Sequence, residues 1–339
     1  MSEPPLLEVR DLSRHFNAGG SLLPGHRLRR IQAVDGVSFD LAEGETLGLV
    51  GESGCGKSTL GRLILRLIEP TAGAVLFEGR DVTQLSGQAL RETRRRIQMV
   101  FQDPYSSLDP RMRIGTVIRE PLDIFRVGTG PERRRRVGEL LERVGLDAGY
   151  AARFPHELSG GQRQRVGIAA ALALEPRLIV ADEPVSALDV SVQAQILNLL
   201  HRLQQELRLA VIFIAHNLDV VEHISDRVAV MYLGKLVEIA PTERLFSAPE
   251  HPYTRALLSA IPIPDPTRSF HPQPLPGELP SPLDPPTGCR FHPRCADALP
   301  ICAEARPALL SYAPGCAVAC HVAAHRLGLV AVREEGGAP

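Results

Sequence analysis

The stretch TLGLVGESGCGKST, residues 46–59, decides the fold of this chain. Its first five residues are apolar or small on both faces, as in a buried parallel strand. The glycine-rich loop that follows matches G-x-x-x-x-G-K-[S/T] at Gly51, Gly56, Lys57 and Ser58. Glycines let backbone N–H groups face phosphate oxygens with no Cβ in the way. The stretch therefore predicts a strand, a phosphate-binding loop and then a helix, which we extend over LGRLILRLI, residues 60–68.

The same loop predicts how a nucleotide is held. Lys57 is expected to reach the β- and γ-phosphates, and the Ser58 hydroxyl to bind Mg²⁺. The positive end of the helix dipole adds to the attraction for phosphate. Ser53, Gly54 and Thr59, from the same loop and the start of its helix, complete the predicted nucleotide-binding set.

An acidic pair follows a second apolar run, in RLIVADEP at 177–184. Asp182 is expected to hold Mg²⁺ through water, and Glu183 to orient and polarise an attacking water molecule. Phosphoryl transfer needs this division, because charge neutralisation and positioning of the nucleophile supply most of the catalysis. Together with the phosphate-binding loop, the pair predicts hydrolysis of ATP.

Composition narrows the classes of partner. The chain has 339 residues, a formal net charge of −1 and 23% charged residues, so it lacks the basic excess of a nucleic-acid-binding protein. The N-terminus has no signal-peptide pattern, and no run of about 20 apolar residues occurs. We expect no nucleic-acid partner, a cytoplasmic chain, and any membrane role to come through another protein.

Apolar strands alternate with helical patterns over most of the chain, which predicts an α/β fold with a largely parallel sheet. The pattern is mostly helical over 104–165, and proline becomes dense from residue 261. We expect a nucleotide-binding domain at 1–260 with a helical subdomain at 104–165. A small Pro/Cys-rich domain is expected at 261–325, beginning with an extended linker, and a flexible tail at 326–339.

A second glycine-rich stretch, LSGGQ at 158–162, precedes a helix-like segment. Taken alone, it fits a turn that caps a helix. However, GESGCGKST, MVFQDP, LSGGQRQR, LIVADEP, SALD and FIAH occur in this order, and the chain resembles the ATP-binding subunits of ABC transporters. The resemblance implies a P-loop ABC ATPase core with a mixed sheet and a helical subdomain. It also implies head-to-tail dimers, in which Ser159, Gly160, Gly161 and Gln162 close over the γ-phosphate of an ATP held by the partner chain.

The resemblance implies roles for four further residues. Gln102 would sense the γ-phosphate and Mg²⁺, and would pass closure of the dimer to a membrane partner. Asp189, in SALD, would contact the opposite subunit. His216 would hold the γ-phosphate and the geometry of Glu183. Phe16 is the candidate to stack on adenine, with packing in the core as its alternative role.

Beyond the ATPase motifs, HPYTRALLSAIP (251–262) and GELPSPLDPPTGCRFHPRC (277–295) resemble the ATPases of oligopeptide and dipeptide importers, most closely the second of two unequal subunits. This implies ATP-driven dimerisation with a second ATPase on two permeases, an extracytoplasmic peptide-binding protein, and a peripheral position on the cytoplasmic face of the membrane. Nickel and peptide-antibiotic importers share this tail, so the cargo stays open. An exporter subunit is disfavoured by the tail. A soluble ABC ATPase of translation or DNA repair is disfavoured by the single phosphate-binding loop.

Five of the six cysteines lie near the end of the chain. Their gaps are wider than the close pairs of structural zinc sites, whereas four thiolates suit a [4Fe–4S] cluster, and some members of the importer subfamily carry one. The predicted ligands are Cys289, Cys295, Cys302 and Cys320, with Cys316 as an alternative fourth. Zn²⁺ and unligated thiols remain the other interpretations. A cluster would staple a tail that has little core of its own.

Overall fold

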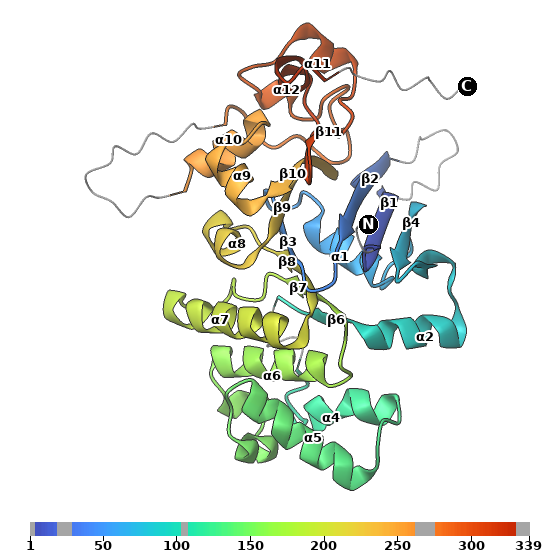
Figure 1. The fold of residues 1–339 in the computed structure, drawn as a ribbon, viewed down its shortest axis with the longest axis vertical. Helices are drawn as coiled ribbons and strands as arrows, with labels where there is room; N and C mark the ends of the chain where they lie inside the picture. The colour runs from blue at the N-terminus through green and yellow to red at the C-terminus, as the bar shows by residue number, and fades with distance from the viewer. Residues whose placement is uncertain (1–3, 19–28, 103–107, 262–274, 330–339) are drawn as a thin grey trace, which may run out of the picture.

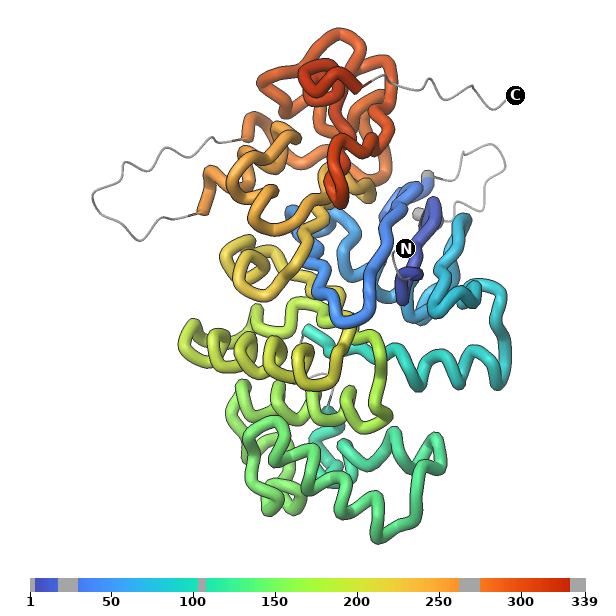
Figure 2. Tube along the Cα trace, in the orientation of Figure 1, coloured from blue at the N-terminus to red at the C-terminus, as the bar shows by residue number. Residues whose placement is uncertain are grey.

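The computed structural model describes residues 4–18, 29–102, 108–261 and 275–329. Its elements form two sheets flanked by helices, with a helical part at one end and the C-terminal segment at the other (Figures 1 and 2). None of the helices in these residues combines the length and apolar character needed to cross a membrane.

The larger sheet carries the parallel strands that the sequence predicts. They are β6 (Ile97–Val100), β7 (Leu178–Asp182), β8 (Ala210–Ile214), β3 (Thr46–Val50) and β9 (Arg227–Tyr232). Three antiparallel strands extend it: β10 (Lys235–Pro241), β12 (Cys316–Val318) and β11 (Leu310–Ala313). The order is β11-β12-β10-β9-β3-β8-β7-β6, so β3, which leads into the phosphate-binding loop, is central. Every residue of β3, β7 and β8 is buried, because both faces of the sheet are covered.

A smaller antiparallel sheet covers one face of the larger one. Its order is β2-β1-β4-β5, formed by β1 (Leu7–Ala18), β2 (Arg29–Leu41), β4 (Ala72–Phe77) and β5 (Arg80–Asp81), and the 3₁₀ turn η1 (Val82–Gln84) follows. Leu178 and Val180 of β7 pack in this layer with α1, whereas Ile179 and Ala181 face the opposite core. The alternating side chains of β7 therefore contribute to two cores, one on each face of the larger sheet.

Helices fall into a core group and an end group. The core helices are α1 (Lys57–Ile64), α2 (Gly87–Arg96), α7 (Val190–Leu207), α8 (Leu218–Ile224), α9 (Thr242–Ser247) and α10 (Pro252–Ser259). The end group holds α4 (Ile114–Ile124), α5 (Gly130–Arg143), η2 (Ala148–Ala152), η3 (Pro155–Glu157) and α6 (Gly160–Leu172). This end group lies at the lower end of Figure 1. Helix α6 runs without a break across residue 165, the predicted end of the helical subdomain.

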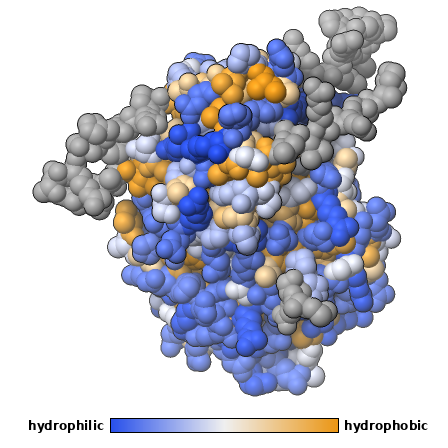
Figure 3. Space-filling model, turned by 45° about the horizontal axis from the view of Figure 1, so that its top comes forward, coloured by the Kyte–Doolittle hydropathy of each residue, from blue (hydrophilic) through white to orange (hydrophobic). Residues whose placement is uncertain are grey.

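The C-terminal segment is joined to the main sheet. It carries η4 (His292–Arg294), α11 (Pro300–Glu304) and α12 (His321–Arg326). Strand β12 pairs with β10 through Val318 and Ala317, and Phe291 packs in the same core as β9. The C-terminal segment thus shares the main core through Phe291 and also has a small cluster of its own, formed by Val318, Cys320 and Ala323. Apolar patches gather on this end of the surface in Figure 3, and Leu299 and Ile301 are among the exposed apolar side chains.

Candidate nucleotide site

The phosphate-binding loop has the backbone that its glycines predict. Gly51 has φ 150, Gly54 has φ 79 and Gly56 has φ 107. A Cβ on Gly51 would lie 2.1 Å from the carbonyl oxygen of Met231, and one on Gly56 would lie 2.0 Å from that of Ala33. No larger residue fits either position. Gly56 is the N-cap of α1 and supplies no side-chain hydrogen bond, so the first N–H groups of α1 remain available for phosphate oxygens.

The lysine and the hydroxyl of the loop are held in different ways. Lys57 is 4% exposed, and its Nζ donates to the carbonyl oxygens of Gly51 at 2.7 Å and Glu52 at 3.1 Å. Ser58 Oγ donates to Asp182 Oδ1 at 2.7 Å. Ser53 and Gly54 are exposed beside them, and Thr59 follows in the first turn of α1. Within the described residues, the hydrogen bonds of this buried ammonium thus go to two carbonyl oxygens and a sulfur.

Asp182 and Ser58 have the donor set of a magnesium site. The aspartate is 2% exposed, and burial raises its pKa, against the hydrogen bond from Ser58, which lowers it. A buried carboxylate oxygen and a hydroxyl oxygen that touch each other are hard ligands suited to Mg²⁺. Gln102, the third predicted ligand, is joined to Glu183 and not to this pair.

Glu183 stands at the centre of a second polar group. Gln102 Nε2 donates to Glu183 Oε2 at 2.8 Å, and His216 Nδ1 lies 3.4 Å from the same oxygen. Glu183 adopts φ 46, a left-handed conformation that costs a non-glycine residue free energy and is concentrated at functional sites. A cavity of about 50 Å³ beside Glu183 and His216 has room for a water molecule. The three side chains predicted to govern hydrolysis therefore lie together.

LSGGQ forms the N-terminal cap of α6. Ser159 Oγ accepts from the Gln162 backbone N–H at 3.3 Å, and Gln162 Oε1 accepts from the Ser159 N–H at 3.0 Å. A Cβ on Gly161 would lie 2.4 Å from Val192, at the start of α7. Helix α6 lies well below α1 in Figure 1, so the two glycine-rich stretches occupy different parts of the chain. Ser159 and Gln162 therefore cap α6, which is the role that the stretch taken alone suggests.

Asp189 caps the neighbouring helix. Its Oδ1 accepts from the Val192 N–H at 3.0 Å and from Ser191 Oγ at 2.8 Å. Both hydrogen bonds lower the pKa of the exposed Asp189 carboxyl, and the one from the Val192 backbone has the larger effect. The next side chain, Val190, is 82% exposed, an apolar group on the surface beside a residue predicted to meet another subunit.

Comparison with known proteins decides the family. A family model described as ABC transporter matches residues 34–186, and one described as the C-terminal region of oligopeptide/dipeptide transporters matches residues 237–302. A putative oligopeptide transport ATP-binding protein of Bacillus subtilis is 54% identical over 325 residues, which cover 95% of this chain and 97% of the relative. A putative peptide import ATP-binding protein of Brucella abortus is 54% identical over 320 residues, with 94% and 98% covered. The chain belongs to the ATP-binding subunits of oligopeptide and dipeptide ABC transporters.

Solved structures agree on the ATPase core. An ATP-binding cassette captured as a dimer with ADP and phosphate matches with a TM-score of 0.62 and 31% identity, over 70% of this chain and 98% of that one. A subunit of the cbiONQ transporter complex of Clostridium perfringens matches with a TM-score of 0.62 and 28% identity, over 73% and 92%. The expected ABC ATPase fold is therefore confirmed, and the chain is an ABC-type ATPase.

Within this ABC ATPase, Phe16 lies at the end of β1, opposite Ile31 of β2. The ring is half-buried, and the guanidinium of Arg14 lies 4.5 Å from its centroid. One face of the ring is therefore already covered by a cation. Its assignment to adenine stays a prediction.

Sequence reasoning missed the residues that hold the outer side of the phosphate-binding loop. The motif assigns no role to Glu52, but Arg294 pairs with its carboxylate and Tyr253 accepts from its backbone N–H. The only signal for Arg294 is its place in the CRFHPRC stretch, which indicates an importer subunit and cysteine ligands but no contact with the loop.

Proposed function

We propose that this chain energises the import of dipeptides or oligopeptides. It would do so by ATP-driven dimerisation with a second ATPase subunit on two permeases, at the cytoplasmic face of the membrane, with an extracytoplasmic peptide-binding protein delivering the cargo. The observation that carries the proposal is that an ABC transporter ATPase domain and the oligopeptide/dipeptide C-terminal region occur in one chain. The curated relatives, named for peptide or oligopeptide transport, support the cargo class.

The cargo and partners are tested by isolating the assembly. Tagged chain is purified without oxygen from detergent-solubilised membranes, and the assembly is placed in lipid vesicles with its binding protein. We expect two integral membrane proteins, a second ATPase of similar size, and ATP hydrolysis stimulated by short peptides. If nickel or a peptide antibiotic stimulates ATP hydrolysis and short peptides do not, the cargo is not a dipeptide or oligopeptide. Recovery with ribosomes or nucleic acid in place of membrane proteins would contradict the transport role.

For hydrolysis, we assign separate roles to the clustered residues. Ser58 and Asp182 would hold Mg²⁺, which neutralises charge on the bound phosphates when present. Glu183 would accept a proton from the attacking water, while His216 and Gln102 keep its carboxylate in place. Lys57 would exchange its carbonyl partners for phosphate oxygens. The contacts of Glu183 with Gln102 and His216 support this assignment.

The exposed start of α6 supports a composite site. Ser159, Gly160, Gly161 and Gln162 would complete the ATP site of the partner ATPase, and Asp189 with Val190 would meet that partner across the interface. Support comes from the separation of α6 from α1 in the fold and from the exposed valine beside Asp189. Apolar groups exposed at a surface are frequent where proteins associate.

We also propose that the C-terminal thiols bind a [4Fe–4S] cluster. All are free cysteines. Burial and, to a smaller degree, charge on Cys302, Cys320 and Cys295 raise the pKa of Cys289 to about 11. These four thiols are therefore within electrostatic range of one another. The charge of Cys320 acts on both Cys289 and Cys295, which supports Cys320 as the fourth ligand, whereas the charge of Cys316 acts on Tyr312.

The wide gaps between the cysteines along the chain favour a cluster over a single Zn²⁺, because structural zinc sites bring their cysteines in close pairs. Among the residues that the structure describes, no three His, Cys, Asp or Glu side chains are grouped as a metal site, so the placement of the side chains supports neither metal group by itself. The cluster would staple the C-terminal segment.

Iron content tests the cluster and its ligands together. Chain purified without oxygen is expected to contain about four iron and four sulfide per molecule. Cys302→Ser should lose most of the iron, because Cys302 is a proposed ligand. The matched control Cys316→Ser should retain it. Stoichiometric zinc, or equal iron loss in both variants, would contradict the assignment.

A further inference from the structure

The carboxylate of Glu52, in the phosphate-binding loop, accepts two hydrogen bonds from an arginine in the C-terminal segment. Arg294 Nη1 lies 2.8 Å from Glu52 Oε2, and Nη2 lies 3.2 Å from Oε1. The Arg294 side chain is 9% exposed and that of Glu52 is 27% exposed. Two parallel hydrogen bonds from a planar guanidinium fix the orientation of a carboxylate as well as balance its charge.

The backbone of the loop is held from the same side. The Glu52 N–H donates to Tyr253 Oη at 2.9 Å, and Tyr253 is fully buried. The Gly234 N–H donates to the carbonyl oxygen of Cys55 at 2.8 Å. Residues that follow β9 therefore contact the loop at Glu52 and Cys55, and Arg294 is the cation that pairs with the Glu52 carboxylate.

Glu52 also faces the phosphate side of the loop. Its carbonyl oxygen accepts from Lys57 Nζ at 3.1 Å, so one residue lies between Arg294 and the lysine expected to meet phosphate. The glycines at 51, 54 and 56 resist bending little. The contacts of Glu52 are thus placed to hold the loop in shape before a nucleotide arrives, and a site shaped in advance binds more tightly.

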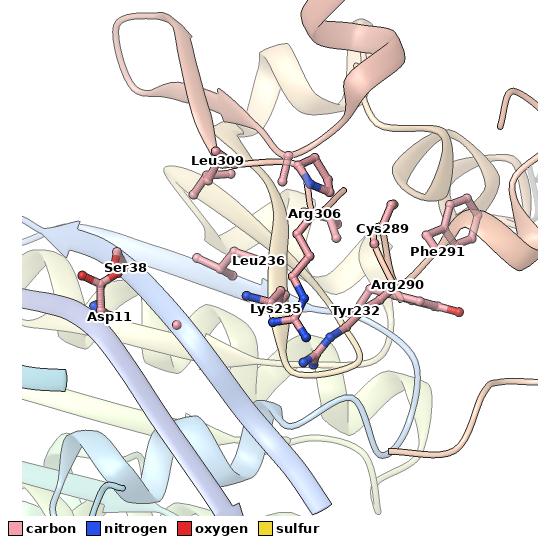
Figure 4. Close-up of a pocket in the computed structure, with 16 residues that line it drawn as sticks. Asp11, Ser38, Tyr232, Lys235, Leu236, Cys289, Arg290, Phe291, Arg306 and Leu309 are labelled. Carbon is pink, nitrogen blue, oxygen red and sulfur yellow. Dashed lines mark hydrogen bonds between the residues drawn. The ribbon is translucent and has the colours of Figure 1, made fainter. Parts of the chain in front are cut away.

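The segment that carries Arg294 has a second attachment. Arg290, whose side chain is 4% exposed, donates to Asp35 and to the carbonyl oxygen of Leu233. Lys235 and Arg306 lie 3.4 Å and 3.5 Å from the same carboxylate. Figure 4 shows these three cationic side chains converging from different segments. Arg290 therefore attaches the segment to β2 by contacts that do not involve Glu52, and this attachment fixes the position of Arg294.

We propose that Arg294 is a positioning residue for ATP. Acting through Glu52, it holds the phosphate-binding loop in its binding shape, so the affinity for ATP depends on the docked C-terminal segment. The inference requires only the ATPase activity of the chain and is independent of the cargo and of the iron–sulfur cluster.

The test is a double-mutant cycle on the full-length chain, read as the Kd for MgATP. Arg294→Gln should weaken binding about tenfold, the equivalent of one charge-assisted hydrogen bond. In a Glu52→Gln background the same change should alter Kd less than twofold, because its target is gone. Arg294→Lys, which keeps the charge but not the paired geometry, should stay at least about threefold weaker than wild type. In the assembled complex, KM for ATP should rise in Arg294→Gln while kcat stays within about twofold.

A matched control separates positioning from simple fastening of the segment. Arg255 pairs with Asp297 of the same segment at 2.6 Å, and within the described residues its side-chain hydrogen bonds and ion pairs do not include the loop. Arg255→Gln should leave Kd within about twofold of wild type. Three results would each overturn the proposal: Arg294→Gln with unchanged Kd, equal weakening with and without Glu52, or full recovery by Arg294→Lys. Melting curves for each variant show whether the protein is folded. Glu52→Gln alone removes the carboxylate that accepts from Arg294, so its Kd for MgATP measures the same contact from the loop residue.

Discussion

Replacing Glu183 with glutamine is expected to slow ATP hydrolysis at least about 100-fold and to leave ATP binding intact. The amide keeps the shape of the side chain but accepts no proton from water. It also presents an N–H₂ group to Gln102 or His216, which now contact Glu183 Oε2 at 2.8 Å and 3.4 Å. Phosphate release at saturating MgATP measures the rate, and equilibrium binding of ATP measures the affinity. With hydrolysis blocked, we also expect ATP to trap a dimer visible by gel filtration.

An exposed glutamate gives the matched control. Glu206 lies on α7 and meets only Arg202, at 4.0 Å, in the ion pairs of the described residues. Glu206→Gln should hydrolyse ATP at the wild-type rate, because an exposed pair contributes little. Turnover of Glu183→Gln within about threefold of wild type would reject Glu183 as the proton acceptor, since such groups contribute about 100-fold or more. Loss of ATP binding in that variant would instead indicate a damaged loop.

The parts of the site that could be predicted are those whose residues are contiguous in the sequence. Strand β3, the loop and the start of α1 follow one another, so local pattern sufficed. The end of α1 could not be predicted in this way. LGRLILRLI is apolar at helical spacing through residue 68, yet the helix ends at Ile64 and Arg66 turns to φ 50. That reversal is set by packing against the smaller sheet and not by propensity.

Contacts between distant segments escaped prediction for a different reason. Glu52 and Arg294 are 242 residues apart, and neither residue type at its position signals the other. The pairing of β12 with β10 is equally invisible, because Cys316–Val318 is too short to show an alternating pattern. The meeting of Gln102, Glu183 and His216 was anticipated only through the family resemblance, since no spacing relates a residue at 102 to one at 216.

Replacing Ser159 with arginine is expected to leave ATP binding to the chain within about twofold of wild type and to reduce turnover of the assembly on the order of 100-fold. Ser159 is exposed at the start of α6, a helix that lies apart from α1 in Figure 1. A long cationic side chain there would keep the two ATPase subunits from closing over the nucleotide. ATP binding to the isolated chain, ATP-dependent dimerisation and phosphate release are measured on the same preparation.

Ser159→Ala separates obstruction from loss of the helix cap. Both variants remove the hydrogen bond from the Gln162 N–H to Ser159 Oγ, at 3.3 Å, and each should lose about 1 kcal/mol of stability. Only arginine adds bulk and charge, so the alanine variant should still dimerise with ATP. Equal loss of turnover in both variants would mean that the hydroxyl itself is needed at the phosphate. Loss of ATP binding by the isolated arginine variant would place LSGGQ in its own chain's site and contradict the composite arrangement, because in that arrangement Ser159 meets only the partner's nucleotide.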